Sequence, residues 1–213
     1  MIATIIGSTG LTGSFLVQQL LADAAITKVI SVSRRASGVT HAKLTEVLIS
    51  DLAKLPAVAS QMRGELYFCC LGTTIKAAGS RENFESVDHD AIVAFARIAK
   101  VHGARSLTLV SSMGAKASSM VFYNQVKGRT EDDVSALGLR SLNIFRPGLL
   151  VGPRRERRLA EGIAATLLVP LAKVLPTRVR TSLMTEAEIL AARMLVEGKA
   201  ARPGAHVIPA RDI

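Results

Sequence analysis

The sequence predicts an α/β fold in which helices cover both faces of a doubly wound parallel sheet. Three observations carry this prediction. Strand-like and helix-like segments alternate along most of the chain, the first strand runs into a glycine-rich turn, and a helix opens directly after that turn. Parallel strands need crossover connections, which are usually helices, so this rhythm is typical of a parallel sheet between helical layers. A chain of 213 residues is long enough for one such core.

Strands are predicted where a short run of β-branched, aliphatic or aromatic residues is bounded by polar or turn-forming residues. Continuous apolar runs of this kind are typical of strands that are buried on both faces. The pattern predicts strands at 2–6, 28–33, 44–49, 65–71, 106–111 and 139–145.

Helices are predicted where apolar residues recur every three or four positions. They are expected at 14–21, from Leu52 onward, at 81–102 and at 119–137, and a glycine follows each of the last two, as is common at helix C-termini. After residue 154 the alternation weakens. Residues 154–213 are therefore expected to form a small substrate-side cap, with two or three helices and a strand at 206–209, on a single domain of residues 1–213.

The glycine-rich turn has the spacing Gly-x-x-Gly-x-x-Gly and consists of Gly7, Ser8, Thr9, Gly10, Leu11, Thr12 and Gly13. A strand, a glycine turn and a helix in this order form a dinucleotide-binding (Rossmann) unit. Gly7 would permit the tight turn, Gly10 the approach of a pyrophosphate, and Gly13 the close packing of the helix on the strand. The helix N-terminus would offer free N–H groups to phosphate. The alternative is a structural turn that binds nothing.

The residues at the end of the second predicted strand indicate which cofactor is preferred. NAD-binding proteins usually carry an Asp or Glu there, which holds the ribose hydroxyls. Here Ser33, Arg34 and Arg35 stand instead. A carboxylate would repel a 2′-phosphate, whereas Arg can bind it with two hydrogen bonds, so NADP(H) is expected unless the arginines are simply exposed loop residues. Asp51 and Leu52 are placed to contact the adenine, although Asp51 could equally cap a helix.

A tyrosine and a lysine four residues apart, Tyr123 and Lys127, lie in the helix predicted at 119–137. Positions i and i+4 share a helix face, so the phenol and the ammonium can share a site. A nearby ammonium lowers the pKa of a phenol and makes it a usable proton donor to a carbonyl that accepts hydride. The fifth predicted strand ends in Ser111 and Ser112, where a hydroxyl can hydrogen-bond the reacting oxygen.

Taken together, these residues resemble the short-chain dehydrogenase/reductase superfamily in its extended and atypical branches. The sequence is most similar to the Tat-interacting oxidoreductase-like proteins, through motifs that span roughly residues 1 to 150: CLGTT at 70–74, VSSMGA at 110–115, YNQVKG at 123–128 and FRPG at 145–148. The resemblance implies an NADP(H)-binding Rossmann domain with a catalytic Ser–Tyr–Lys set. That set would be Ser112, Tyr123 and Lys127, with Ser111 as the alternative serine.

The same resemblance implies further cofactor contacts. Leu71, Gly72 and Thr73 would form the turn that passes the cofactor, Lys127 would also hold the nicotinamide ribose, and the turn at 147–148 (Pro147 and Gly148) would lie near the nicotinamide. Many relatives carry Asn early in the helix after the fourth strand, whereas this chain has Val87–Asp88. Relatives often dimerise through the two helices at 81–102 and 119–137, so a homodimer is a further expectation.

Composition narrows the remaining functions. The formal net charge is +10, and part of the excess is clustered at Arg154, Arg155, Arg157, Arg158, Arg178 and Arg180. No helix-turn-helix, zinc or aromatic-rich RNA-binding pattern accompanies these arginines, so nucleic-acid binding is not expected. The four histidines are scattered without metal-ligand spacing, so no metal site is expected. The apolar stretch at 163–175 contains Pro170 and Lys173 and is too short to span a membrane.

Two adjacent cysteines, Cys69 and Cys70, lie in the strand predicted at 65–71. They are interpreted as reduced thiols that pack in the core. No signal peptide is recognisable after Met1, and the two observations together predict a cytoplasmic protein.

The function predicted is an NADP-dependent reduction of a small carbonyl compound. The alternative is an NADP(H)-binding regulatory or protein-interaction module with little turnover. The sequence identifies neither the substrate nor the oligomeric state.

Overall fold

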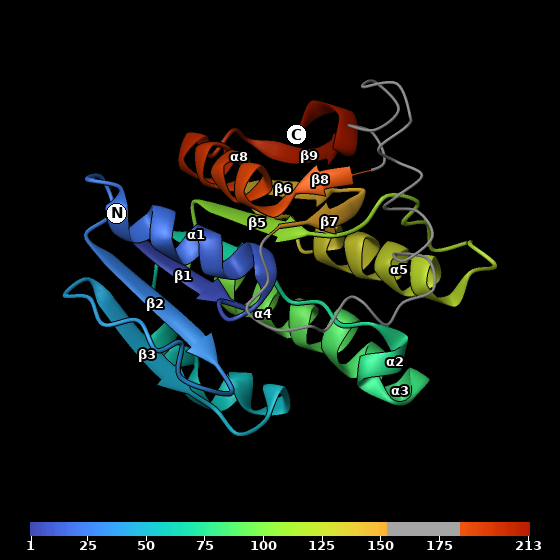
Figure 1. Ribbon diagram of the computed structural model, residues 1–213, viewed down its shortest axis with the longest axis horizontal. Helices are drawn as coiled ribbons and strands as arrows, with labels where there is room; N and C mark the ends of the chain where they lie inside the picture. Colours follow the sequence, from blue (N-terminus) through green and yellow to red (C-terminus); the bar gives the residue numbers. More distant parts are fainter. Residues whose placement is uncertain (153–183) are drawn as a thin grey trace.

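The computed structural model describes residues 1–152 and 184–213, and its core is a seven-stranded sheet (Figure 1). The strand order is β3-β2-β1-β4-β5-β6-β9, and every neighbouring pair is parallel. The strands are β1 (Ile2–Ile6), β2 (Lys28–Ser33), β3 (Leu44–Leu48), β4 (Leu66–Cys69), β5 (Ser106–Val110), β6 (Ser141–Arg146) and β9 (Gly204–Pro209). The predicted doubly wound parallel sheet is confirmed.

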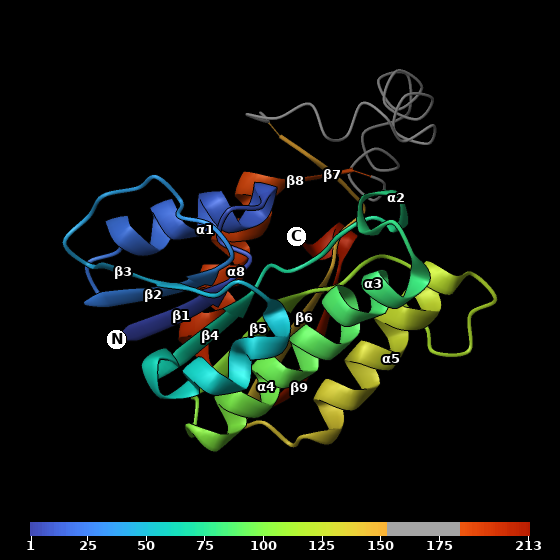
Figure 2. The same ribbon diagram turned by 90° about the horizontal axis from the view of Figure 1, so that it is seen from below.

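Helices cover both faces of the sheet (Figure 2). Helices α1 (Leu11–Ala22) and α8 (Ala187–Ala200) pack on one face, around a core that includes Leu16, Phe68 and Met194. The 3₁₀ segment η1 (Leu52–Met62) and helices α4 (Ala91–Val101) and α5 (Phe122–Ala136) pack on the other. All the strands are parallel, so their carboxyl ends meet at one edge, where open α/β sheets bind ligands.

The turn after β1 depends on two close backbone approaches. Gly7 has φ +80°, and a Cβ on it would lie 2.5 Å from the carbonyl carbon of Cys70, directly after β4. A Cβ on Gly13 would lie 2.1 Å from the Gly7 carbonyl oxygen. Only glycine fits at either position, because real side chains never approach backbone so closely. The turn lies between β1 and β4, where the strand order reverses: β2 and β3 continue the sheet on one side of this point, and β4, β5 and β6 on the other.

The helix predicted at 81–102 is interrupted. Helix α3 (Arg81–Glu85) leads into a π-helical turn, η2 (Ser86–Asp90), before α4 begins. A π turn inserts a residue into the helical ladder and is frequent at functional sites. The short helix α2 (Ile75–Ala78) precedes this segment and was not predicted.

The predicted C-terminal cap needs correction in part. Helix α8 lies against α1, and β9 pairs with β6 as the last strand of the sheet, so both belong to the main layers rather than to a cap. Two short strands, β7 (Leu149–Val151) and β8 (Met184–Glu186), form a second parallel pair. Residues 153–183, including the clustered arginines, lie outside the described residues.

The approach of Gly13 to Gly7 leads to a prediction about stability. Gly13→Ala should lower the free energy of unfolding by about 1–3 kcal/mol, the usual cost of overpacking, because the new methyl group collides with backbone. Helix propensity alone would favour alanine by about 1 kcal/mol. Denaturant unfolding measures the difference, with Ser14→Ala as the control at the next, exposed position. Equal stability of the two variants would contradict the close packing.

Candidate functional site

The turn between β1 and α1 has an exposed glycine and, at the start of the helix, a buried hydroxyl with no hydrogen-bond partner among the described residues. Gly10 is the N-cap of α1. A Cβ on Gly10 would meet only two backbone oxygens within 4 Å, the nearer being that of Gly7 at 3.3 Å. The buried Thr12 hydroxyl has no hydrogen-bond partner among the described residues. Ser8 is occupied, since its Oγ accepts a hydrogen bond from Ser31 at 2.7 Å. Thr9 and Leu11, the other members of the turn, are partly buried.

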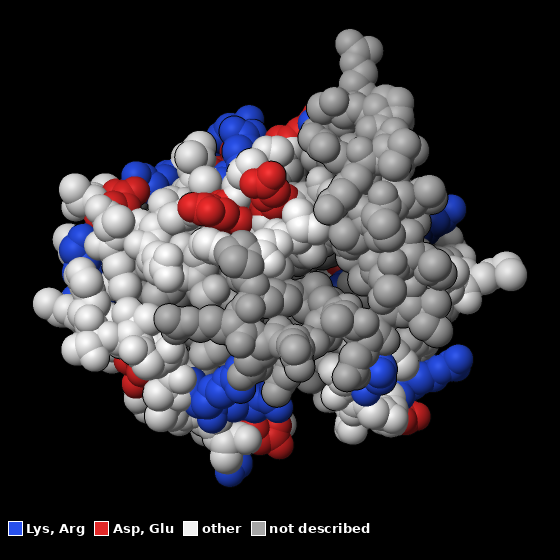
Figure 3. All heavy atoms as spheres, in the orientation of Figure 1, with Lys and Arg blue, Asp and Glu red and all other residues white. Residues whose placement is uncertain are grey.

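The end of β2 is basic and carries no acidic side chain. Ser33 is buried, and its hydroxyl donates a hydrogen bond to the Arg35 carbonyl oxygen at 2.6 Å. Arg34 and Arg35 are exposed beyond it. Figure 3 shows basic side chains gathered at the edge of the molecule where β2 ends. This end of the strand can therefore accept an anionic group.

Asp51 and Leu52 have structural contacts of their own. The Asp51 carboxylate accepts a hydrogen bond from the Ala53 N–H at 3.0 Å and caps η1, and Leu52 packs into the core. The helix cap, one of the two roles predicted for Asp51, is therefore present.

The two serines at the end of β5 differ in their contacts. The Ser111 hydroxyl donates a short hydrogen bond to the Glu131 carboxylate. The Ser112 hydroxyl is buried and has no partner among the described residues. Because a hydroxyl already bound to a buried carboxylate is not free to bind another oxygen, Ser112 is the better candidate for contact with a ligand.

Tyr123 and Lys127 both lie on α5, one turn apart. The Tyr123 ring packs on Phe84, with 5.5 Å between ring centroids, and this fixes the ring plane. Lys127 is buried, and its Nζ lies 2.7 Å from Oδ1 of Asp88, which is also fully buried. Burial lowers the pKa of Lys127, but the charges of Asp88 and Tyr123 outweigh it and leave that pKa raised. Lys127 is therefore a fixed cation beside the phenol.

Two further turns converge near these residues. After β4, the Thr73 N–H donates to Oδ2 of Asp88 at 2.8 Å. Gly72 lies beside Lys127, and a Cβ added to it would be 3.9 Å from the Lys127 Nζ. After β6, the Pro147 carbonyl oxygen accepts from the Met113 N–H at 2.9 Å. Gly148 follows in the same turn and donates to Thr185, whereas Leu71 is partly buried against the core. The turns after β4 and β6 are therefore anchored to Asp88 and to the loop after β5.

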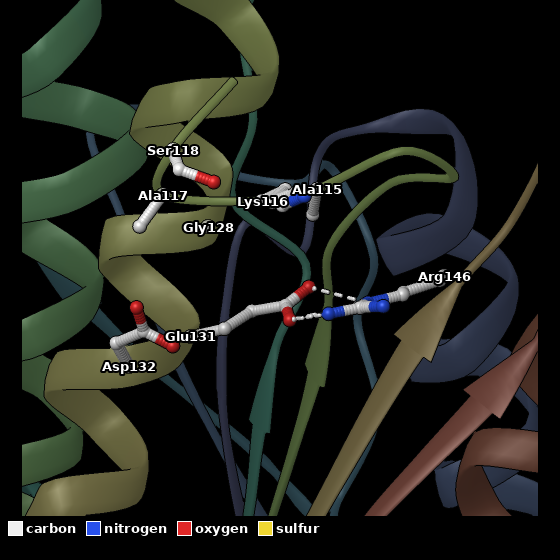
Figure 4. Close-up of a pocket in the computed structure, with 8 residues that line it drawn as sticks. All are labelled: Ala115, Lys116, Ala117, Ser118, Gly128, Glu131, Asp132 and Arg146. Atoms are coloured by element: carbon white, nitrogen blue, oxygen red, sulfur yellow. Dashed lines mark hydrogen bonds and ion pairs between the residues drawn. The ribbon is translucent and has the colours of Figure 1, made fainter.

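A shallow hollow of about 430 Å³ lies between α5 and the loop after β5 (Figure 4). In it, Glu131 reaches from α5 to the guanidinium of Arg146 and binds it through both carboxylate oxygens. The hydrogen bond to Glu131 raises the pKa of Arg146, although partial burial opposes it. The hollow also contains Lys116 and Asp132. Its two central charges, Glu131 and Arg146, are paired with each other, so it is not the main candidate site.

Sequence reasoning missed Asp88, Glu131 and Arg146 as structural partners of the predicted site residues. In the described parts of the chain, no group of three or more His, Cys, Asp or Glu side chains is arranged to hold a metal ion. Within residues 1–152 and 184–213, no helix is long and apolar enough to cross a membrane. Burial raises the pKa of both cysteine thiols, that of Cys69 to about 12, so the thiols stay protonated.

A family model described as NAD(P)H-binding matches residues 7–160, most of the chain. The chain belongs to this NAD(P)H-binding family. Its match begins at the glycine turn and extends past the turn at 147–148, so it covers the loops that follow β1, β2, β4, β5 and β6.

Relatives within the family support the resemblance seen in the sequence. "Protein fmp52, mitochondrial" of Emericella nidulans is 38% identical over 176 residues, which cover 80% of this chain and 76% of that protein. "Protein HTATIP2" of Rattus norvegicus is 37% identical over 163 residues, covering 75% of this chain and 67% of that protein. The predicted similarity to the Tat-interacting oxidoreductase-like proteins is confirmed.

Solved structures share the fold at low identity. MoeE5 in complex with UDP-glucose and NAD aligns with a TM-score of 0.74 and 15% identity, over 98% of this chain and 75% of that chain. A short chain dehydrogenase family protein from Francisella tularensis aligns with a TM-score of 0.73 and 14% identity, over 99% of this chain and 98% of that chain. The chain thus has the fold of NAD-binding dehydrogenases and epimerases.

The predicted cytoplasmic location is wrong by comparison with these relatives. The fungal proteins from Emericella nidulans, Scheffersomyces stipitis and Candida albicans are all named mitochondrial. The prediction depended on two reduced thiols and on the residues after Met1. Reduced thiols indicate a reducing environment but do not distinguish between the compartments that provide one.

The hydrogen bonds of Glu131 lead to a prediction about the stability of two variants. Glu131→Gln keeps the side-chain volume but removes the charge that Arg146 and Ser111 share, so the free energy of unfolding should fall by about 2 kcal/mol. The neighbouring, exposed Asp132→Asn should change it by less than about 0.5 kcal/mol. Thermal or urea unfolding of both variants makes the comparison. Equal losses would mean that the buried cluster contributes nothing specific.

Proposed function

We propose that the protein is an NADP(H)-dependent oxidoreductase that reduces a small carbonyl compound. The observation that supports this most is the placement of Tyr123 and Lys127 on one turn of α5, beside the turn after β4. The hydroxyl of Ser112, two residues past the end of β5, has no hydrogen-bond partner among the described residues. Together these groups can deliver a proton to a carbonyl, stabilise the resulting phenolate and orient the carbonyl oxygen.

The carboxyl edge of the sheet fits a dinucleotide. Gly10 is exposed at the N-cap of α1 and carries no Cβ, so the free N–H groups of the first helical turn would be available to a phosphate there. The buried Thr12 hydroxyl in the same turn has no partner among the described residues and would bind a phosphate oxygen. Of the remaining proposed contacts, Leu71, Gly72 and Thr73 would flank the cofactor from β4, and Pro147 and Gly148 from β6. A homodimer through α4 and α5 stays a prediction.

The basic end of β2 favours NADP over NAD in this proposal. Arg34 and Arg35 are exposed where a carboxylate would otherwise bind the ribose hydroxyls. A guanidinium can form two hydrogen bonds with a 2′-phosphate. The hydroxyl of Ser33 already donates to a backbone carbonyl oxygen within the loop, so the proposed contact with the phosphate comes from a guanidinium group rather than from this hydroxyl.

Tyr123, Lys127 and Ser112 would each have one role in the reaction. A nicotinamide cofactor held by the glycine turn and by Arg34 would supply the hydride that the carbonyl carbon accepts. Tyr123 gives its phenolic proton to the carbonyl oxygen, so that an alcohol forms, and the phenolate then regains a proton from solvent. Lys127 stabilises the phenolate by its charge and can hold the ribose. Ser112 donates a hydrogen bond to the reacting oxygen and orients it.

Cofactor preference tests the first part of the proposal. NADPH should bind at least about tenfold more tightly than NADH, which corresponds to about 1.4 kcal/mol, and Arg34→Ala should narrow this difference. Isothermal titration calorimetry measures both affinities. Lys28→Ala is the matched control, because it removes an exposed positive charge at the opposite end of the same strand. Equal affinities in the unmodified protein would refute the preference for NADP.

Replacement of Tyr123 tests the proposed proton transfer. Tyr123→Phe keeps the ring and its packing on Phe84 but removes the proton, so cofactor affinity should change little. Turnover of a carbonyl substrate found by screening should fall about a hundredfold or more. NADPH oxidation measures the rate, and Tyr67→Phe, the other tyrosine, is the control.

Two results would overturn parts of this assignment. If Tyr123→Phe turns over at the wild-type rate, the proton comes from another group. If NADPH binds tightly but a broad screen of aldehydes, ketones and quinones yields no turnover, a regulatory or interaction role replaces the enzymatic one.

A further inference from the structure

Asp88 is a fully buried carboxylate, and no step of the proposed reaction uses it. It lies in the π-helical turn η2, where its backbone carbonyl oxygen accepts a hydrogen bond from the Thr130 hydroxyl of α5 at 2.8 Å. That hydroxyl also donates to the Val126 carbonyl oxygen within α5. The backbone of the π turn is therefore joined to α5, which fixes the point from which the Asp88 side chain extends.

The two carboxylate oxygens of Asp88 contact two different elements. Oδ1 lies 2.7 Å from the Nζ of Lys127 on α5. Oδ2 accepts a hydrogen bond at 2.8 Å from the Thr73 N–H, which belongs to the turn after β4. A single short side chain thus determines how far the ammonium of Lys127 lies from the turn after β4.

The ion pair lies beneath an exposed position of that turn. The side chains of Lys127 and Asp88 are 5% and 0% exposed, whereas Gly72 is exposed. A Cβ added to Gly72 would lie 3.7 Å from Oδ1 of Asp88 and 3.9 Å from the Lys127 Nζ. Because glycine places no side chain there, a ligand that crosses the turn at Gly72 would pass within reach of the ammonium.

Lys127 keeps hydrogen-bonding capacity after it pairs with Asp88. A lysine ammonium has three N–H donors, and the contact with Oδ1 of Asp88 occupies one of them. Burial alone would lower the pKa of Lys127, and Asp88 is the strongest of the charges that oppose this effect. A buried ammonium needs such a counter-charge, because its desolvation would otherwise be uncompensated. Asp88 therefore keeps a charged donor fixed below the turn.

We propose that Asp88 is a positioning residue for the nicotinamide half of the cofactor, because it holds the Lys127 ammonium and the turn after β4 in the arrangement that binds the ribose. This inference rests on the proposed function, in which Lys127 holds the nicotinamide ribose. A donor and a turn that are already fixed lose little conformational freedom when the ribose binds. The adenosine half is proposed to bind other elements, at the glycine turn after β1 and at Arg34 after β2.

The two halves of the cofactor can be tested separately. Asp88→Asn keeps an oxygen that can accept from the Thr73 N–H but removes the charge that holds Lys127. NADPH should then bind at least about tenfold more weakly, the usual scale for loss of a hydrogen bond to a charged group. Adenosine 2′,5′-bisphosphate, which lacks the nicotinamide ribose, should bind as tightly as it binds the wild type. Isothermal titration calorimetry measures both affinities.

The matched control is Asp90→Asn, which removes a 70% exposed carboxylate from the same π turn and should leave both affinities unchanged. Asp88→Glu is a second variant that keeps the buried ion pair, in case Asp88→Asn does not fold. Its longer side chain cannot hold Lys127 and the Thr73 N–H at their present distances. NADPH should therefore bind it about threefold more weakly or worse, with no change for the bisphosphate.

Unchanged NADPH affinity in the folded Asp88 variants would overturn the inference. Equal losses for NADPH and the bisphosphate would also overturn it, because Asp88 would then support the fold in general and not the nicotinamide half. A wild-type protein that binds neither probe would instead refute the proposed function, and this failure is recognised before any variant is compared.

Discussion

The structure depends on the close approach of three backbone segments around the glycine turn. Gly7 lies against the peptide that follows β4, and Gly13 lies against Gly7, at distances that leave no room for a Cβ. This contact brings α1 down onto β1 and brings the ends of β1 and β4 together. Because the sheet is wholly parallel, the loops after β2, β5 and β6 then open at the same edge. The candidate site is a consequence of that packing.

Local patterns in the sequence are sufficient for most of this fold. The strand predicted at 28–33 matches β2, since a short apolar run bounded by polar residues is a local signal. Two features were beyond such reasoning. The π turn at Ser86–Asp90 inserts one residue into an otherwise regular helical pattern, which apolar spacing does not reveal. Strand β9 contains the strand predicted at 206–209, but it is a half-exposed edge strand with few buried side chains, so its sequence does not show that it pairs with β6 in the main sheet.

The candidate site, too, could be predicted from the sequence only in part. Tyr123 and Lys127 are neighbours through helix geometry alone, so their spacing predicted that they share a face. Asp88 is an acidic residue in an amphipathic segment, where carboxylates usually face solvent, and only the tertiary fold brings it to Lys127. Glu131 likewise reaches Ser111 across 20 residues of chain. Such partners are not visible in one sequence, because a buried ion pair is a long-range contact without a local pattern.

The two buried carboxylates act on α5 in different ways. The partner of Glu131, Arg146, is one-third exposed, so water shares in balancing its charge. The partner of Asp88 is almost completely buried, so the balance there must come from the protein itself. Glu131 occupies the hydroxyl of Ser111 and leaves that of Ser112 for a ligand, while Asp88 fixes the ammonium of Lys127. Each carboxylate thereby contacts a residue of the proposed site, and these contacts offset part of the cost of burying its charge.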